Sequence, residues 1–427
     1  FRESHKNQNI FQTMTKQACK KISIIGGSLY GILLAVQIKK QLRNKVEIVI
    51  HEKGNQILQS WNEQDINGIK ITNGFHGIEI PRSLNFSKIL GNKFIDENFK
   101  KIANYKLIWL NDRLVPYRYD IGLLPDNIRN ELEGLKNDSD VRDYLKYGNT
   151  GELGDLLKRV GRRYGDGIES YFHMIFPWYF PNQFFREDRL LSSQTRKKQE
   201  SHYLIPKDGT FVKARKNLEE YLNELDIKVE TNSQIDIEEK MDGEINIWAT
   251  NTAILARRYL GKDVEYLRHN KRNLTVSLFK IKSEELRRTM STFEYRPSEI
   301  LIMDKEDIDL ARMSFMDIKN DSRKKYVILE SQSDSKKIIE EEEIKKISEK
   351  ILSSELEYIG SKEIGTLFNA GMNNYETIEK KFEEIEKRID VKVGFKYWWP
   401  INSCRAADAA VQYSREIIEE IKERDER

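Results

Sequence analysis

The sequence predicts an α/β protein in which a parallel sheet of the nucleotide-binding kind is joined to a second, antiparallel sheet. Three observations lead to this fold class. A β-branched run at 21–25 is followed by a glycine-rich turn and an apolar helical segment at 32–40. Another β-branched run at 46–50 completes a strand–helix–strand unit, which requires parallel strands. Alternating apolar runs between residues 274 and 330 are typical of antiparallel strands, so they belong to a different sheet.

The glycine-rich turn has the spacing of a dinucleotide-binding loop. Gly26, Ser28 and Gly31 occupy its three glycine positions, with Gly27 between the first two. In such a loop the first glycine permits the tight turn, the second lets the backbone approach a diphosphate, and the third lets the helix pack on the strand. Ser28 departs from this pattern, since it adds a small side chain whose hydroxyl can donate a hydrogen bond.

An acidic residue ends the second predicted strand. Glu52 is in the position from which a carboxylate accepts hydrogen bonds from the ribose hydroxyls of an adenosine. A carboxylate there repels a 2′-phosphate, so FAD or NAD is favoured over NADP. Lys53 follows it and is included in the predicted cofactor site. The alternative is an ordinary carboxylate at the end of a strand.

The order of the segments predicts domains that interweave. Residues 84–200 show helical periodicity and are expected to be mostly helical, and another helix is expected over 335–356. No linker rich in Gly and Ser divides the chain. The expected organisation is a discontinuous Rossmann-like cofactor domain at 17–80, 203–262 and 365–427, with a mainly helical region at 81–202 and an antiparallel-sheet substrate domain at 263–364 inserted into it.

Composition argues against nucleic acid as the main partner. The chain has 427 residues, enough for about two or three domains, and 39% of them are hydrophobic. Its 72 Lys and Arg are interleaved with 69 Asp and Glu, so no domain-wide basic surface is expected.

Cysteine usage and hydropathy predict a cytoplasmic protein. Cys19 and Cys404 lie far apart in the sequence, which indicates neither a disulfide framework nor a zinc site. No apolar run is long enough to span a bilayer. Residues 1–13 are polar and patternless, and three interpretations stay open: an added leader, a remnant of organelle targeting, or a disordered N-terminus.

Downstream of the strand–helix–strand unit, the segment 67–77 ends in Gly74, His76 and Gly77. At this point the sequence resembles the flavoprotein superfamily that contains monoamine oxidase, protoporphyrinogen oxidase and UDP-galactopyranose mutase. The resemblance implies FAD as the cofactor and His76 against the flavin ring as the candidate catalytic residue. The glycine-glycine-arginine segment that is usual just before this element is absent, and 57–61 stands in its place.

The resemblance continues through the rest of the chain. It includes a hairpin-like segment at 107–117, and Pro206 and Gly209 before a helix at 212–225. It implies that the strand at 227–232 lies beside the adenine, with Val229 among the cofactor-binding residues.

Near the C-terminus, the resemblance implies that a last strand of the cofactor sheet ends at Gly394. It also implies a following helix that is capped by Asn402 or Ser403. A capped helix N-terminus is suited to stabilise negative charge on a reduced flavin.

For the substrate, Arg312 and Tyr375 are similar to mutase residues that reach the diphosphate of a UDP-sugar. Three functions stay open: a nucleotide-sugar or glycan-precursor enzyme, an amine or carbon-centre oxidase or desaturase, and a degenerate FAD-binding protein without turnover. The expected partners are a small-molecule substrate, with a UDP-sugar as the candidate, NAD(P)H as a candidate reductant, and a second copy of the chain.

Overall fold

The computed structural model describes most of the predicted cofactor domain and much of the inserted sheet. The described residues are 20–72, 78–80, 84–103, 105–110, 113–116, 202–235, 244–250, 255, 258–259, 269–284, 297–302, 310–316, 326–333, 341–370, 375–389, 391–393 and 403–426.

A five-stranded parallel sheet forms the centre of the predicted cofactor half, which confirms the predicted Rossmann-like sheet. Its order is β10-β2-β1-β11-β17, so β1 lies in the middle and strands from distant parts of the chain lie on either side. The strands are β1 Lys20–Ile25, β2 Val46–His51, β10 Ile227–Glu230, β11 Ile245–Trp248 and β17 Lys392–Val393. The cofactor half is therefore built from discontinuous segments.

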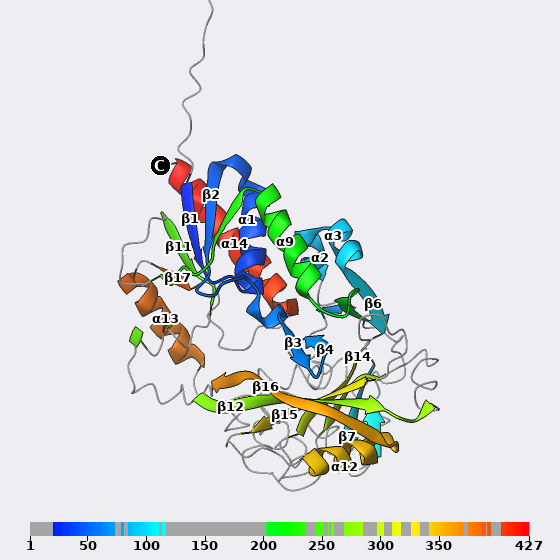
Figure 1. Ribbon diagram of the computed structural model, residues 1–427. Coiled ribbons are helices and arrows are strands. Elements are labelled where there is room, and N and C mark those ends of the chain that lie inside the picture. The colour runs from blue at the N-terminus through cyan, green and yellow to red at the C-terminus, as the bar shows by residue number, and fades with distance from the viewer. Residues whose placement is uncertain are drawn as a thin grey trace, which may run out of the picture.

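Helix α1, Leu29–Leu42, is apolar on nearly all sides and is correspondingly buried on nearly all sides. It lies between the sheet and α14, Ser403–Glu426, and α9, Val212–Glu224, belongs to the same hydrophobic core (Figure 1). The short helices α2, Leu84–Leu90, and α3, Asn92–Asn98, extend this core. No helix among the described residues has an apolar stretch long enough to cross a membrane.

Helix α9 leads directly into β10, and this connection fixes where the helix begins. A helix that precedes a strand of a parallel α/β sheet runs antiparallel to it, so α9 starts at the carboxyl edge of the sheet. The glycine turn after β1 lies at the same edge. The first turn of α9 and the glycine turn are thus on one side of the molecule.

A seven-stranded sheet forms the second half, in the order β16-β12-β15-β14-β13-β7-β8. Its pairs are antiparallel except for β13 and β7, which are parallel. The strands are β7 Tyr105–Leu110, β8 Arg113–Pro116, β12 His269–Ile281, β13 Pro297–Ile302, β14 Leu310–Met316, β15 Tyr326–Ser333 and β16 Leu356–Ala370.

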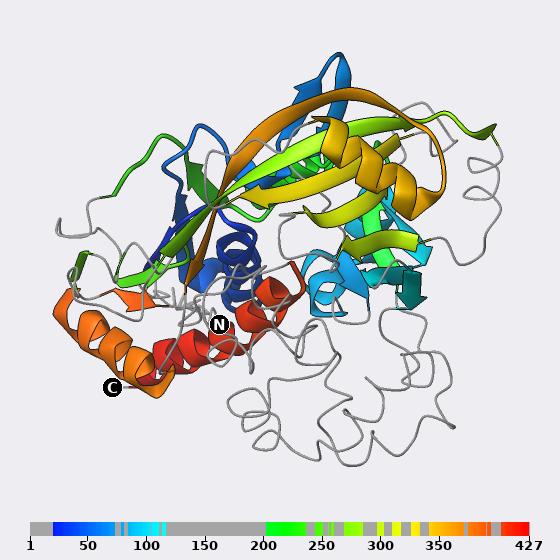
Figure 2. The ribbon, with the colours of Figure 1, turned by 90° about the horizontal axis from the view of Figure 1, so that it is seen from below.

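Helix α12, Glu341–Leu352, covers one face of this sheet, and Figure 2 shows it lying across the twisted strands. The other face receives a hairpin of β3, Glu63–Ile66, and β4, Ile69–Thr72, which reaches down from the five-stranded sheet (Figure 1). Ile66 and Ile71 of the hairpin pack there on Val276 and Ile328. This contact joins the two halves.

The expectation of a mostly helical segment at 84–200 is wrong for the described residues within 99–116, which form strands, while residues 117–201 lie outside the described part of the chain. Strand β6, Phe99–Ala103, pairs with β9, His202–Pro206, which also pairs with β5, Ile78–Ile80. Strands β7 and β8 form the hairpin that the resemblance implied. The aromatic and β-branched residues here favour strands, and their pairing partners are too far away in the sequence for local periodicity to show.

Two other boundaries differ from the sequence interpretation. The helix expected over 335–356 is described from Glu341 to Leu352, and strand β16 follows it almost directly. Strand β16 continues to Ala370, beyond the boundary expected at residue 364, before α13, Tyr375–Ile389. The long strand pairs with β12 along its whole length, so it belongs to the seven-stranded sheet.

Candidate functional site

The turn between β1 and α1 requires a glycine at its first position. Gly26 has a φ of +116°, and a Cβ there would lie 2.8 Å from Cβ of Thr250 and 3.1 Å from the carbonyl oxygen of Ala249. The Gly26 amide donates to the carbonyl of His51 at 2.8 Å. The turn is therefore held between the ends of β2 and β11, in a conformation that a side chain would strain.

Gly31 lies where α1 passes closest to the turn. A Cβ on Gly31 would collide with the carbonyl oxygen of Gly26 and lie 3.1 Å from Cβ of Ala249. Helix α1 consequently begins directly against the sheet. The start of this helix and the positive end of its dipole are at the carboxyl edge, where an anion is stabilised.

Glu52 joins the glycine turn to the end of β2. Its Oε2 accepts a hydrogen bond from the Gly27 amide at 2.8 Å, and its Oε1 accepts one from the Gly54 amide at 2.7 Å. The Glu52 amide donates to the carbonyl of Glu230 at 2.8 Å, which ties the residue to β10. Each carboxylate oxygen has more than one acceptor position, so the side chain can accept further donors.

Ser28 uses its side chain inside the protein. Its Oγ accepts from the Gly31 amide at 3.2 Å as the N-cap of α1, and donates to the carbonyl of Ala249 at 2.7 Å. The hydroxyl proton that the sequence left available for a ligand is therefore directed to the residue after β11. Ser28 can therefore offer its backbone N–H, and not its hydroxyl, to a ligand at this turn.

Two other predicted cofactor residues lie along the same edge. Lys53 is exposed, and Val229 on β10 is half-buried and lies beside Ile50 of β2. Next to Val229, Glu230 accepts from Lys228 at 2.6 Å and pairs with His51 at 3.2 Å. The hydrogen bond from Lys228 holds the pKa of Glu230 below its ordinary value, although burial opposes this effect.

The flavin-side predictions fall mostly outside the described residues. His76, Gly74, Gly77, Gly394 and Asn402 all lie there. Ser403 is the first residue of α14 and Tyr375 the first of α13, and in both cases the description covers the backbone alone. Their roles stay predictions.

The segment that replaces the glycine-glycine-arginine element closes over the glycine turn with apolar side chains. The Leu58 amide donates to the carbonyl of Gly27 at 2.9 Å, and a Cβ on Gly27 would lie 2.7 Å from Cγ2 of Ile57. A short 3-10 helix, η2, follows at Gln59–Trp61. Trp61 is buried and packs on Phe211, with ring centroids 4.7 Å apart. This segment supplies an apolar wall at the turn.

A polar group beside η2 was not predicted from the sequence. The guanidinium of Arg215, in the first turns of α9, donates to Oδ1 of Asn62. The same oxygen accepts from Gln56 Nε2 at 2.5 Å. In the sequence Arg215 is one of several cations on an amphipathic helix, so no local signal separates it from a surface residue.

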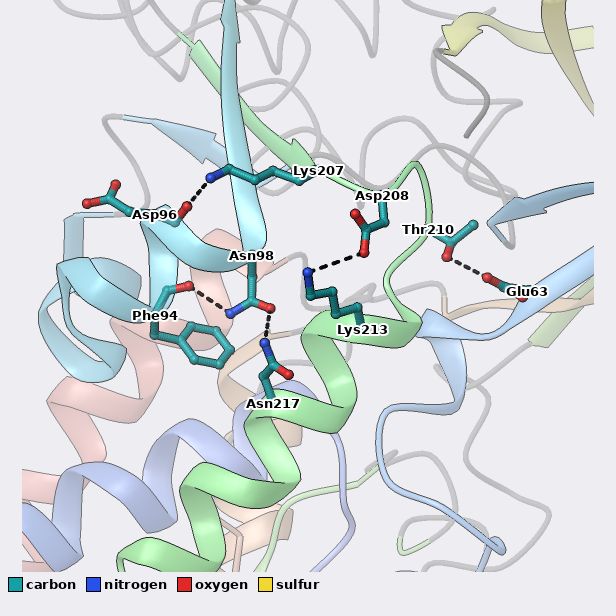
Figure 3. A network of polar contacts seen from close by, with 9 residues as sticks. All are labelled: Glu63, Phe94, Asp96, Asn98, Lys207, Asp208, Thr210, Lys213 and Asn217. Carbon is teal, nitrogen blue, oxygen red and sulfur yellow. Dashed lines mark hydrogen bonds and ion pairs between the residues drawn. The ribbon is translucent and has the colours of Figure 1, made fainter. Parts of the chain in front are cut away.

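Helix α9 is also anchored by polar contacts on its other sides, which Figure 3 shows. Asn217 donates to Asn98 at 2.7 Å, which fixes the helix on α3. Lys213 lies 3.6 Å from Asp208 in the preceding turn (Figure 3). The first turns of α9 are thus held in one position relative to the carboxyl edge of the sheet.

The predicted substrate residue Arg312 has a buried carboxylate as its partner. Arg312 and Glu330 lie opposite each other on β14 and β15, and Nε and Nη2 of the arginine donate to the two carboxylate oxygens at 2.8 and 2.7 Å. The side chain of Glu330 is 3% exposed and that of Arg312 is 20% exposed. By the alternation of the strands, this pair is on the sheet face that packs on the β3–β4 hairpin.

The part of the chain that the structure describes contains no cluster of His, Cys, Asp or Glu able to hold a metal ion.

Comparison with solved structures shows where this fold occurs. The chain is similar to a candidate protoporphyrinogen oxidase from Exiguobacterium sp. 255-15, with a TM-score of 0.64, 13% identity, and 94% of this chain and 100% of that chain covered. It is similar to reduced UDP-galactopyranose mutase, with a TM-score of 0.62, 13% identity and coverage of 94% and 96%. It is also similar to a putrescine oxidase redesigned in its cofactor binding, with a TM-score of 0.56, 10% identity and coverage of 95% and 99%.

These structures belong to the FAD amine oxidase superfamily, so the resemblance predicted from the sequence is confirmed at the level of the fold. No protein-family model and no curated protein matches the sequence.

Proposed function

We propose that this chain binds FAD at the carboxyl edge of the five-stranded sheet and is a flavin-dependent enzyme acting on a small molecule. One observation carries the proposal: Glu52 bridges the amides of Gly27 and Gly54 beside the start of α1. This arrangement occurs in a fold that the chain shares, over 94% of its length, with structures of the FAD amine oxidase superfamily.

The described residues fit a dinucleotide. The turn presents backbone at Gly26 and Gly27, where side chains would meet Thr250 and Ile57, and the N-terminus of α1 opens beside it. Glu52 provides a fixed carboxylate for ribose hydroxyls. A backbone cradle, a helix N-terminus and an acid at the end of the second strand form the donor and acceptor set that an adenine dinucleotide needs.

When bound, FAD supplies the electron-transfer chemistry. In the proposal, Glu52 orients the ribose, the first amides of α1 hold the diphosphate, and the backbone at Val229 lies beside the adenine. The start of α14, at Asn402 and Ser403, holds negative charge near the flavin. Gly74, His76, Gly77 and Gly394 are proposed for the flavin side, with His76 as the catalytic candidate.

Among the possible reactions, the Arg312–Glu330 pair favours a redox substrate over a nucleotide sugar. A diphosphate that bound Arg312 would bring further negative charge beside a carboxylate that is 3% exposed. It would also compete with Glu330 for the planar face of the guanidinium. We therefore propose an oxidoreductase that acts on an amine or carbon centre. A mutase-like enzyme using Arg312 and Tyr375 is the second candidate, and a binding protein without turnover is the third.

Cofactor uptake tests the first step. Purified protein incubated with FAD should retain, after desalting, the absorbance maxima of an oxidised flavin at about 370 and 450 nm. It should also melt at a higher temperature than the FAD-free protein. Protein that stays colourless with no shift in melting temperature contradicts the proposed function.

Substrate titrations of the FAD-loaded protein then separate the candidates. Bleaching of the flavin under anaerobic conditions by an amine panel supports the oxidase. Calorimetric binding of UDP or a UDP-sugar, without bleaching, supports the mutase-like enzyme, and bleaching by NADH or NADPH alone identifies the reductant. Absence of all three responses supports the binding protein.

A further inference from the structure

We infer that Arg215 supplies the buried positive charge for the diphosphate of the bound dinucleotide, in place of the arginine that is missing from the segment 57–61. This inference rests on the proposed FAD site. It assigns a role to a side chain of α9, which the sequence did not single out.

Arg215 is a buried cation without an anionic partner in the described chain. The residue is 8% exposed, and its side-chain hydrogen bond goes to the neutral Oδ1 of Asn62. The adjacent carboxylate, Glu63, is already engaged: Oε1 accepts from Thr210 at 2.5 Å and Oε2 lies 3.4 Å from Lys70 (Figure 3 shows the first contact). A guanidinium has five N–H donors, and a buried charge without an opposite charge is costly.

The position of Arg215 places this charge at the cofactor edge of the sheet. Helix α9 begins at the carboxyl edge, and Arg215 is in its first turns. Its partner Asn62 directly follows η2, and Oδ1 of Asn62 also accepts a hydrogen bond from Nε2 of Gln56, just before the segment 57–61. Between Gln56 and η2, Leu58 donates to the carbonyl of Gly27. One short segment therefore connects the guanidinium to the glycine turn.

A diphosphate is the anion that fits this place. The segment 57–61 has no cationic residue, and Lys53, the cation nearest to Glu52 in the sequence, is exposed. A diphosphate at the N-terminus of α1 carries two negative charges, and a planar guanidinium pairs with phosphate oxygens through parallel hydrogen bonds. Binding would then supply the counter-charge that the described part of the chain does not provide to Arg215.

The test compares Arg215→Met with Lys213→Met. Methionine retains much of the length of Arg215 and removes its charge. Lys213 is a matched control because it is a cation two residues earlier in the same helix and has an anionic partner, Asp208, in the preceding turn. Three quantities are measured for each variant: the FAD dissociation constant, the ADP dissociation constant from competition with FAD, and the melting temperature of the FAD-free protein. ADP carries the diphosphate and no flavin.

Arg215→Met should weaken both FAD and ADP by roughly 10- to 100-fold, as expected for a lost charge-assisted pair, and should leave the melting temperature of the FAD-free protein unchanged or higher. Lys213→Met should change neither affinity by more than about twofold. Arg215→Lys should recover part of both affinities. If Arg215→Met does not fold, a weaker affinity of Arg215→Lys for both ligands, relative to the wild type, supports the inference.

Two results overturn the inference while leaving the proposed function intact. One is a fall in the melting temperature of FAD-free Arg215→Met with unchanged affinities, which would make Arg215 a structural residue. The other is a weaker affinity for FAD with an unchanged affinity for ADP, which would mean that Arg215 lies near the flavin rather than the diphosphate. Absence of FAD binding by the wild type overturns the proposed function and the inference together.

Discussion

The amide of Gly27 lies 2.8 Å from Oε2 of Glu52, so a single carboxylate closes the glycine turn onto the end of β2. The same carboxylate holds Gly54 through its other oxygen. Because Glu52 is also the residue proposed to accept the ribose hydroxyls, the shape of the loop and the affinity for the cofactor depend on one side chain. Substitutions at Glu52 should therefore change both properties.

Glu52→Ala should weaken FAD binding by about 1.5–3 kcal/mol, the range for lost hydrogen bonds to a charged group. It should also lower the free energy of unfolding of the FAD-free protein by about 1–3 kcal/mol, since the amides of Gly27, which is buried, and Gly54, which is half-buried, lose their acceptor. Flavin titration and urea unfolding measure the two effects. Lys53→Ala is the control, because Lys53 is adjacent and exposed. Equal FAD affinity in Glu52→Ala and the wild type would make Glu52 a purely structural residue.

The serine at the second glycine position offers a separate test. Ser28→Ala removes the N-cap of α1 and the bond to Ala249, and should cost about 1 kcal/mol of stability. Ser28→Gly should cost only a few tenths of a kcal/mol, since glycine is a tolerated cap. FAD affinity should be maintained in Ser28→Gly, because the hydroxyl points into the protein. A large loss of FAD affinity in Ser28→Gly, measured by the same titration, would show that the serine side chain contacts the cofactor.

The parts of the fold that are local in sequence could be predicted. The unit from β1 to β2, with its glycine turn and Glu52, depends on spacing within about thirty residues and on a turn that only small residues fit. The helix α9 and the strands β10 and β17 were also predicted close to where they occur. In each case the residues of one segment are enough to show its secondary structure.

What could not be predicted depends on contacts between distant segments. The parallel pair of β7 and β13 joins residues that are far apart in the chain. Local helical periodicity predicted a mostly helical region there, whereas pairing with a distant segment makes β7 a strand. Arg312 was predicted as a substrate residue, but its guanidinium donates two hydrogen bonds to the carboxylate of Glu330 on the neighbouring strand. Arg215 was not identified because its burial and its hydrogen bond to Asn62 arise from the packing of segments that are far apart in the sequence.

The pair of Arg312 and Glu330 should show strong coupling in a double-mutant cycle. Each single substitution, Arg312→Met or Glu330→Leu, removes the two hydrogen bonds of the pair from the charge that remains and should cost about 3–5 kcal/mol of unfolding free energy. The double variant should cost much less than the sum, because both charges are removed together. Urea unfolding of the four proteins measures the coupling. Additive losses would mean that the two side chains do not stabilise each other.

Substitutions of Arg312 also test the second functional candidate, the mutase-like enzyme. If a UDP-sugar binds at Arg312, Arg312→Ala should weaken its binding to the reduced protein by about 2–4 kcal/mol, and Arg312→Lys should recover part of that loss. Calorimetry at a temperature where urea unfolding shows each variant to be fully folded separates binding from stability. Absence of UDP-sugar binding by the wild type in both redox states removes the mutase-like candidate.

The interface between α1 and α14 should make the protein sensitive to alkaline pH. Burial, together with the negative charges of Glu386 and Glu416, raises the pKa of Tyr413 on α14 far above its ordinary value. Burial, followed by the influence of Tyr413, likewise raises the pKa of Tyr30 on α1. In the unfolded chain both phenols ionise near about pH 10, whereas in the folded protein they stay protonated. The stability that depends on them is therefore complete below about pH 10 and is lost as the pH rises above it.

Each of these two tyrosines should remove up to about 1.4 kcal/mol of unfolding free energy for each pH unit above 10. Tyr413→Phe keeps the packing and removes the titration, so its loss of stability between pH 8 and about pH 11 should be smaller than that of the wild type. Urea unfolding at the two pH values measures this difference. Tyr358→Phe is the control for the loss of a tyrosine hydroxyl, because the hydroxyl of Tyr358 bonds Ser361 on β16 and lies outside the α1–α14 interface. Identical pH dependence in Tyr413→Phe and the wild type would mean that the Tyr413 hydroxyl ionises as readily in the folded protein as in the unfolded chain.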